Sequence, residues 1–136
     1  MHVDELETPV PVVDVDRLEA NITRLQAYLD SYNIANRPHI KTHKIPAIAA
    51  LQVEAGATGI TCQKVSEAEV MAAAGFTDIF IPYNILGASK LSRLMALAAE
   101  GEVSVTADSA YVVRGLSKAA VQAGLTLTVL VECDTG

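Results

Sequence analysis

The chain has 136 residues, with ten lysines and arginines against sixteen aspartates and glutamates, and a net charge of −6 at pH 7. This length allows one domain with a sizeable core. The acidic balance argues against a general surface for nucleic acid or anionic membrane, because phosphate binding needs clustered cations. About half of the residues are apolar and tryptophan is absent, so we expect an aliphatic, alanine-rich core.

The cysteines and the amino terminus indicate where the protein resides. Cys62 and Cys133 each lie in an apolar run, which favours small buried side chains over a disulfide framework. Residues 1–9 are acidic and lack the apolar centre of a signal peptide, and nowhere do eighteen apolar residues run together. We therefore expect a soluble cytoplasmic protein with no membrane or nucleic-acid partner.

The first elements are a lead-in segment and a helix. Residues 8–15 are rich in β-branched residues and contain two prolines, which is typical of an edge or irregular strand. Asp16 is placed to cap the helix that follows, and this helix should end near residues 31–33. Four aliphatic side chains share one face of the helix at helical spacing: Leu18, Ile22, Leu25 and Leu29.

The rest of the chain repeats a short apolar strand, a polar break, an alanine-rich helix and a glycine. The expected strands are one that ends at Lys41 and four more at residues 58–62, 78–81, 102–106 and 125–132. A left-handed residue should close each helix at Gly56, Gly75, Gly101 and Gly124. The helix caps are expected at Ser66, Ser89, and Asp108 or Ser109.

These units predict the fold class. Strands without strict alternation, separated by helices of about ten to fifteen residues, are typical of parallel β/α units buried on both faces. No dinucleotide-binding or P-loop motif follows any of the strands. Because a closed β/α barrel has eight strands, we predict an α/β fold that holds about the first half of a TIM-type barrel. The chain would then be the amino-terminal portion of a longer protein; a complete small open sheet is the alternative.

The reactive groups of parallel β/α folds lie at the carboxyl ends of the strands. In chain order this rule selects His39, Lys41 and His43, then Cys62 and Gln63, Tyr83 and Asn84, Asp108, and Glu132 and Asp134. Lys41 stands out, because an amine at the mouth of an apolar barrel loses hydration and can form a Schiff base with a carbonyl. Spacing alone does not choose among Lys41, Lys44 and Lys64, or exclude a surface lysine in a basic loop.

The histidines near Lys41 have more than one interpretation. His39 and His43 are four residues apart, a spacing that suits a shared metal on a helix but not at a strand end. His43 with Lys44 can line a phosphate or carboxylate pocket, or hydrogen bond to a neighbouring loop.

The later strand ends leave alternatives open as well. Glu132 and Asp134 share one face of the last predicted strand and can act as paired carboxylates in proton transfer, or orient another polar group. Tyr83 and Asn84 can reach a ligand or serve packing.

Residues 37–44, with the sequence Arg-Pro-His-Ile-Lys-Thr-His-Lys, closely resemble the D-threonine aldolase and D-serine dehydratase group of pyridoxal-phosphate enzymes. This group is related to the amino-terminal barrel of alanine racemase. Further segments resemble the group's opening strand, second loop and helix, third strand, and the strand that runs on towards the cofactor: residues 8–14, 62–69, 78–84 and 131–136.

The resemblance implies that Lys41 is bonded to pyridoxal 5'-phosphate (PLP), and it makes four strand-end residues candidate cofactor contacts: His39, His43, Gln63 and Tyr83. It implies a PLP-dependent lyase of the D-threonine aldolase type, which cleaves D-3-hydroxy amino acids to glycine and an aldehyde. The alternatives are a D-serine or 3-hydroxy-D-aspartate dehydratase, and a non-catalytic PLP-binding barrel.

The resemblance also implies parts that these residues do not contain. The group completes the barrel, holds the cofactor phosphate with later loops, and adds a carboxyl-terminal β domain with a divalent metal of the Mn or Mg type. We therefore expect residues 1–136 to form the amino-terminal portion of the PLP-binding barrel, without metal ligands and inactive alone. A homodimer is a further expectation for the full-length protein.

Overall fold

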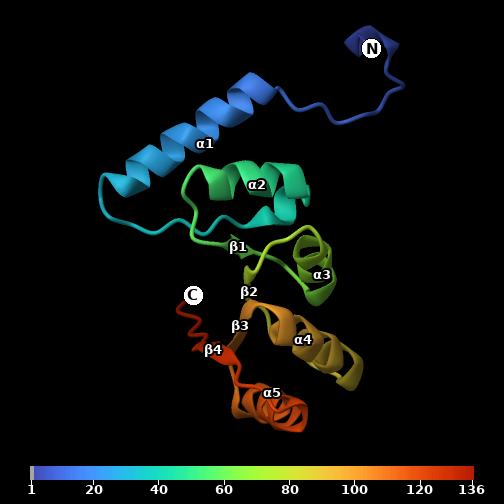
Figure 1. Ribbon diagram of the computed structural model, residues 1–136, viewed down its shortest axis with the longest axis vertical. Coiled ribbons are helices and arrows are strands. Elements are labelled where there is room, and N and C mark those ends of the chain that lie inside the picture. Colours follow the sequence, from blue (N-terminus) through green and yellow to red (C-terminus); the bar gives the residue numbers. More distant parts are fainter. Residues whose placement is uncertain (1) are drawn as a thin grey trace.

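The computed structural model describes residues 2–136 (Figure 1). In these residues the α-helices are α1 (Val15–Asp30), α2 (Pro46–Glu54), α3 (Val65–Ala73), α4 (Ala88–Glu100) and α5 (Ala110–Ala123). Two short 3-10 helices, η1 (Val3–Glu5) and η2 (Ile40–Thr42), precede α1 and α2. The strands are β1 (Ile60–Thr61), β2 (Asp78–Ile81), β3 (Glu102–Ala107) and β4 (Thr128–Val131).

The four strands form one parallel sheet in the order β1-β2-β3-β4. In its register Ile79 lies opposite Ile60 on one side and Val103 on the other. The strands step down the molecule in Figure 1 with α3, α4 and α5 alongside them, while α1 and α2 lie beyond β1. This arrangement confirms the predicted α/β class with repeated parallel β/α units.

The predicted strand that ends at Lys41 is wrong. Only one parallel bridge forms there, between His39 and Thr61, and the chain then turns into η2. The carbonyl oxygen of Ile40 accepts the N–H groups of His43 and Lys44 at 3.2 and 2.8 Å, which closes a turn in place of a ladder. The opening segment also forms no strand, since residues 10–14 have no regular structure.

Helix α1 differs from its prediction in its cap and its buried face. Asp14 caps it instead of Asp16, because the Asp14 carboxylate accepts the N–H of Arg17 at 3.1 Å. Leu25 is 53% exposed, whereas Gln26 is buried. The Gln26 amide explains this difference, since it bonds to both Asn36 and Asp30. The helix ends at Asp30, as predicted.

The predicted boundaries of the later helices are confirmed in part. Ser109 caps α5 by accepting the N–H of Val112, but α3 begins directly after Lys64 and α4 after Gly87, so Ser66 and Ser89 are not caps. Positive φ angles occur at three of the four predicted glycines, Gly56, Gly75 and Gly124. Gly101 is extended instead, and it lies where an added Cβ would be 2.8 Å from the carbonyl oxygen of Thr77.

The core is aliphatic, as predicted, and lies between the sheet and helices α3, α4 and α5. Its largest fully buried side chains are Ile40, Ile60, Met71, Ile79, Ile81, Leu94, Leu116, Val105 and Cys62. The second cysteine does not follow its prediction: Cys133 is exposed, because β4 ends at Val131 and Cys133 belongs to the irregular tail.

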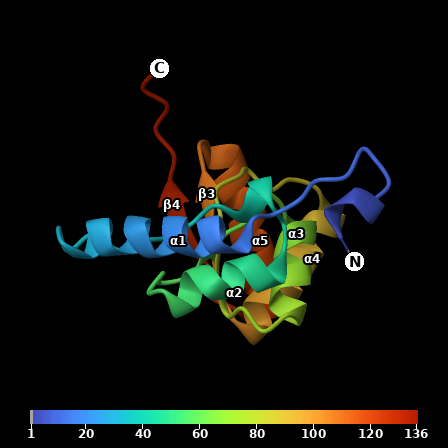
Figure 2. The same ribbon diagram turned by 90° about the horizontal axis from the view of Figure 1, so that it is seen from above.

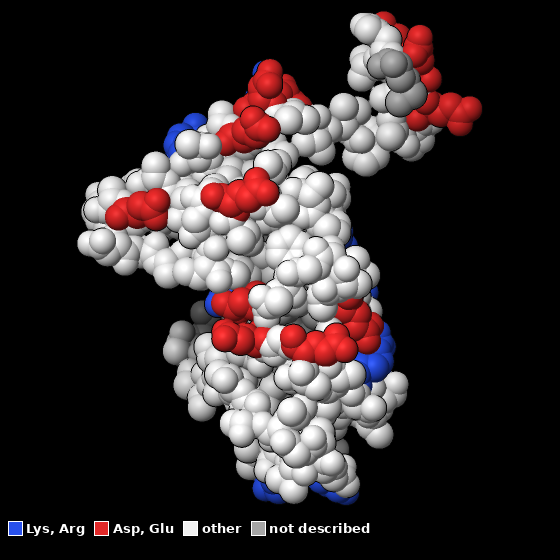
Figure 3. Space-filling model, viewed as in Figure 1, with Lys and Arg blue, Asp and Glu red and all other residues white. Residues whose placement is uncertain are grey.

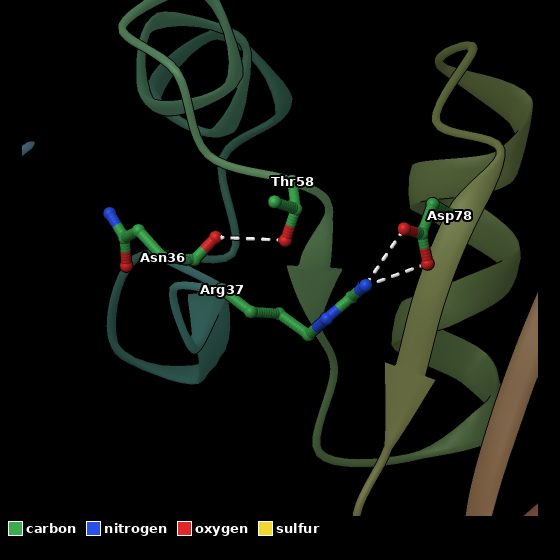
Figure 4. A network of polar contacts seen from close by, with 4 residues as sticks. All are labelled: Asn36, Arg37, Thr58 and Asp78. Carbon is green, nitrogen blue, oxygen red and sulfur yellow. Dashed lines mark hydrogen bonds and ion pairs between the residues drawn. The ribbon is translucent and has the colours of Figure 1, made fainter. Parts of the chain in front are cut away.

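An ion pair fixes the segment before η2 at the amino ends of the strands. Arg37 donates two hydrogen bonds to the Asp78 carboxylate, at 2.8 and 2.7 Å, and Thr58 donates one to the carbonyl oxygen of Asn36 at 3.1 Å (Figure 4). Gly59 lies beneath Arg37, where a Cβ would be 2.8 Å from the carbonyl oxygen of Asp78. The chain is thus anchored at the amino edge just before it crosses to the carboxyl edge.

Charge is unevenly spread over the surface. Carboxylates predominate on the face seen in Figure 3, and few lysines or arginines lie among them. Within residues 2–136 no helix is long and apolar enough to cross a membrane.

Candidate cofactor site at the carboxyl edge of the sheet

The carboxyl ends of all four strands lie at one edge of the sheet, because the strands are parallel. In Figure 2 the β4 arrow points to this edge, on the side of the C-terminus. Gln63 follows β1, Tyr83 follows β2, Asp108 follows β3 and Glu132 follows β4. These predicted residues therefore lie at a common edge, as expected for residues that follow parallel strands.

Lys41 lies in the middle of η2, next to the fully buried Ile40. Its backbone N–H donates to Nδ1 of His39 at 3.3 Å, which orients the turn, while its side chain is exposed. The desolvation expected at this position is therefore not provided by residues 2–136. No ion pair joins the Lys41 amine to any other residue in this range.

His39 is half-buried beside Lys41. Burial lowers the pKa of His39 and the charge of Lys41 lowers it further, against smaller opposite effects of Glu67 and Gln63. The neutral imidazole is thereby favoured. Because Nδ1 accepts the Lys41 N–H, the neutral ring carries its proton on Nε2.

His43 has the same local geometry, since its Nδ1 accepts the N–H of Ile45 at 3.0 Å. This bond supports the interpretation that His43 organises a loop. Its Nε2 is buried, and no hydrogen-bond partner for this atom is found in the described part of the chain.

Lys44 differs from Lys41 in having a partner for its amine. Its Nζ lies 3.0 Å from Oε1 of Glu67, whose side chain is only 7% exposed. The other oxygen of Glu67 accepts the N–H of Gln63 at 2.8 Å. Burial by itself raises the pKa of Glu67, but the Gln63 N–H and the Lys44 ammonium outweigh it, so the pKa is lowered and the carboxylate is ionised at neutral pH.

Gln63 and Tyr83 line a common cavity of about 290 Å³ between the loops after β1 and β2, together with Lys64, Lys90 and Arg93. Lys41 does not line this cavity. The structure thus brings two of the predicted cofactor contacts together at the carboxyl edge of the sheet. Their role in cofactor binding remains a prediction.

Glu132 lines a second cavity, of about 420 Å³, with Tyr83 and Asn84. Asp134 is not paired with it: β4 ends at Val131, and the Asp134 carboxylate accepts the N–H of Gly136 at 3.0 Å. The predicted shared strand face for these two carboxylates is therefore wrong.

The remaining strand-end residues have structural contacts. The side-chain oxygen of Asn84 accepts the N–H of Asp108 at 3.1 Å, which ties the loop after β2 to the loop after β3. Burial, with a further contribution from the charge of Glu67, raises the pKa of Cys62 to about 12. Cys62 is thus a core residue and not a nucleophile. Across residues 2–136 no three His, Cys, Asp or Glu side chains gather as metal ligands.

Comparison with known proteins identifies the family. Residues 13–136 match the family described as the alanine racemase N-terminal domain. The chain belongs to this family. Among solved structures, D-threonine aldolase from Filomicrobium marinum superimposes on this chain with a TM-score of 0.95 at 42% identity. The match covers 98% of this chain and 36% of that structure's chain.

The curated relatives of this alanine racemase-type domain include both aldolases and dehydratases. D-threonine aldolase from Arthrobacter sp. is 46% identical over 96% of this chain and 35% of its own length. D-threo-3-hydroxyaspartate dehydratase from Delftia sp. is 35% identical over 96% of this chain and 34% of its own. The chain thus spans about a third of the length of these relatives.

The alanine racemase N-terminal domain family implies PLP as the cofactor. A lysine that bonds to an aldehyde must present a primary amine that is accessible and makes no ion pair. Lys41 meets this requirement, since it is exposed and makes no ion pair within the described range, whereas the Lys44 amine is held by Glu67. The residues present therefore fit the cofactor.

Sequence reasoning missed two ion pairs of this domain: Lys44–Glu67, near the candidate site, and Arg37–Asp78, at the amino edge of the sheet. Each joins residues far apart in the chain, 23 and 41 positions respectively. One signal was available, because Glu67 stands between the apolar Val65 and Ala68 at the start of a buried helix. A carboxylate at such a position requires a partner.

Proposed function

We propose that this chain is the amino-terminal part of a PLP-dependent lyase of the D-threonine aldolase type. The substrates would be D-3-hydroxy amino acids, cleaved to glycine and an aldehyde. The observation that carries this proposal is the 46% identity to D-threonine aldolase over 96% of the chain. The accessible, unpaired amine of Lys41 supports it.

Lys41 would hold PLP through a covalent bond between its Nζ and the aldehyde carbon of the cofactor. When bound, PLP supplies an electron sink for breaking a bond at the α-carbon of an amino acid. His39 fixes the backbone of Lys41 through Nδ1 and presents a proton on Nε2. We propose His39, His43, Gln63 and Tyr83 as the further cofactor contacts from this chain.

The remaining machinery would lie outside these residues, since the chain spans about a third of its relatives. We propose that residues 1–136 contribute the first strands of the PLP-binding barrel. The rest of the barrel would hold the cofactor phosphate, and a carboxyl-terminal β domain would hold a divalent metal of the Mn or Mg type. The metal would engage the substrate hydroxyl.

A second candidate is a dehydratase that removes the β-hydroxyl of a D-3-hydroxy amino acid. The 35% identity to D-threo-3-hydroxyaspartate dehydratase from Delftia sp. favours it. The residues of this chain would hold PLP in the same way in both enzymes. Only the products separate the two activities.

Product analysis of the full-length protein tests the proposal. With PLP, a manganese salt and D-threonine, we expect glycine and acetaldehyde in equal amounts, and no product from L-threonine. Ammonia and 2-oxobutanoate would instead establish the dehydratase. Bound PLP without turnover of D-threonine or D-3-hydroxyaspartate would identify a non-catalytic barrel and overturn the proposal.

A further inference from the structure

Glu67 has no role in the proposed function, yet it is a buried carboxylate at the candidate site. Its Oε2 accepts the N–H of Gln63 at 2.8 Å, and its Oε1 lies 3.0 Å from Nζ of Lys44. A carboxylate that is only 7% exposed costs free energy unless it has partners. Here Oε2 has a hydrogen bond, whereas Oε1 has the ion pair with Lys44 but no hydrogen bond within the described residues. Glu67 therefore joins the loop after β1 to the turn that carries Lys41.

The backbone of Lys44 adopts an unfavourable conformation at this contact. Lys44 has a φ of 55°, in the left-handed region that residues with a side chain seldom adopt. Such a conformation persists where the surroundings determine it. Two contacts do so here: the Lys44 N–H donates to the carbonyl oxygen of Ile40 at 2.8 Å, and its amine pairs with Glu67.

The same contacts give the two lysines of the turn different surroundings. Lys41 and Lys44 both carry a primary amine and are three residues apart. Both lysines are exposed, Lys44 by 55% of its side chain, but only the Lys44 amine has an ion-pair partner, Glu67 on α3, within the described residues. Because the bond from Lys44 to Ile40 closes the turn around Lys41, the position of Lys44 also sets the position of Lys41.

We propose that Glu67, acting through Lys44, is a positioning residue that makes Lys41 the amine that bonds to PLP. This inference rests on the proposed function, since it requires a PLP-binding lysine in this turn. The resemblance to the family implies Lys41 without giving a cause, and the inference adds a physical reason for the choice between these two neighbouring amines.

The test locates the cofactor in the full-length protein. PLP-loaded protein is treated with borohydride, which fixes the cofactor on its lysine, and is then digested for mass spectrometry. Wild type should carry the label on Lys41. Glu67→Gln keeps an acceptor for the Gln63 N–H but loses the charge that holds Lys44. We expect part of its label on Lys44, and a dissociation constant for PLP raised on the order of tenfold.

The matched control is Glu69→Gln. Glu69 lies on the same helix, and its carboxylate also pairs with a cation, Arg93, but it is more exposed and has no contact with the turn. This variant should keep all the label on Lys41, and the position of the label is its readout because Arg93 also lines the cavity with Gln63 and Tyr83.

Substitutions of Lys44 test the same ion pair by changing the partner of Glu67. Lys44→Arg keeps a positive charge for Glu67 but has no primary amine, so we expect PLP affinity near that of wild type. Lys44→Met removes the charge, and its loss of affinity should match that of Glu67→Gln. If circular dichroism shows that Glu67→Gln does not fold, the comparison of these two variants carries the test.

Two results would overturn the inference: folded Glu67→Gln with all its label on Lys41 and unchanged affinity, or equal PLP affinity of Lys44→Arg and Lys44→Met. Label on a residue other than Lys41 in wild type would instead contradict the proposed role of Lys41. The two failures are therefore distinguishable.

Discussion

Among the glycines of the described residues, Gly59 has the least room for a side chain. An added Cβ would collide with the Arg37 guanidinium and lie 2.8 Å from the carbonyl oxygen of Asp78. Gly59→Ala should therefore displace Arg37 and lower the free energy of unfolding by about 1–3 kcal/mol. Denaturant unfolding of the full-length protein measures this change.

Gly115 provides the control for that substitution. A Cβ there would meet only Cδ1 of Leu91, at 3.8 Å, and Gly115 lies inside α5. Since alanine is the better helix former, Gly115→Ala should be neutral or stabilise the protein by up to about 1 kcal/mol. Equal effects at the two glycines would contradict the account of the Arg37–Asp78 contact.

Cys62 is predicted to be inert in the folded protein. It is fully buried, and burial raises its pKa to about 12. Iodoacetamide at about pH 8, near the ordinary pKa of a thiol, should leave Cys62 unmodified in the native protein and modify it after unfolding. Mass spectrometry of the peptide that contains Cys62 reads the result, and rapid native modification would show that this part of the core opens.

At the scale of elements, the contact between η2 and α3 should depend on pH through Glu67. Its pKa in the folded protein lies below 4.5, its ordinary value. A carboxylate with a lowered folded pKa contributes stability that is complete above the unfolded pKa and is lost as the pH falls through the folded one. In acid, the free energy of unfolding of the wild type should therefore approach that of Glu67→Gln.

Denaturant unfolding of both proteins over a pH series measures this dependence. The difference in unfolding free energy should be constant near neutral pH and shrink as the pH falls below about 4.5. A difference that is the same in acid and at neutral pH would mean that packing, and not the charge of Glu67, stabilises the contact.

Helices and strands were predicted well where the local sequence pattern determines their positions. They were predicted less well where contacts between distant residues determine them. The parallel β/α order follows from apolar runs and glycines, and the end of α1 at Asp30 follows from its sequence. The turn at Lys41 was mistaken for a strand end because Ile40 closes it with its own carbonyl oxygen. Lys41 was still placed at the correct edge, since both interpretations put it after the bridge at His39.

The contacts of the site were harder to predict than its position. The partner of Lys44 is Glu67, and the partner of Arg37 is Asp78. Only the register of the sheet brings these pairs together, and one sequence does not reveal register between segments so far apart. The exposure of Cys133 was missed for a related reason, because β4 ends earlier than its apolar run suggests.

At the scale of the whole molecule, β4 has a strand neighbour on only one side within residues 2–136. Leu130 and Val131 on this strand are 45% and 82% exposed. We propose that the next part of the barrel covers them, so a polypeptide of residues 1–136 alone should associate with itself and show no activity on D-threonine. Light scattering and an assay for acetaldehyde measure both properties, and turnover by this polypeptide would show that the half-barrel account is wrong.

The central claim is that Lys41 holds PLP, and locating the cofactor on the full-length protein tests it most directly. After borohydride reduction, peptide mapping should place a single pyridoxyl group on Lys41, and Lys41→Ala should lose the visible absorbance of the lysine-bound cofactor, whereas Lys44→Ala retains it. A label on Lys44 or Lys64 in the wild-type protein, or no labelled lysine at all, would contradict the account.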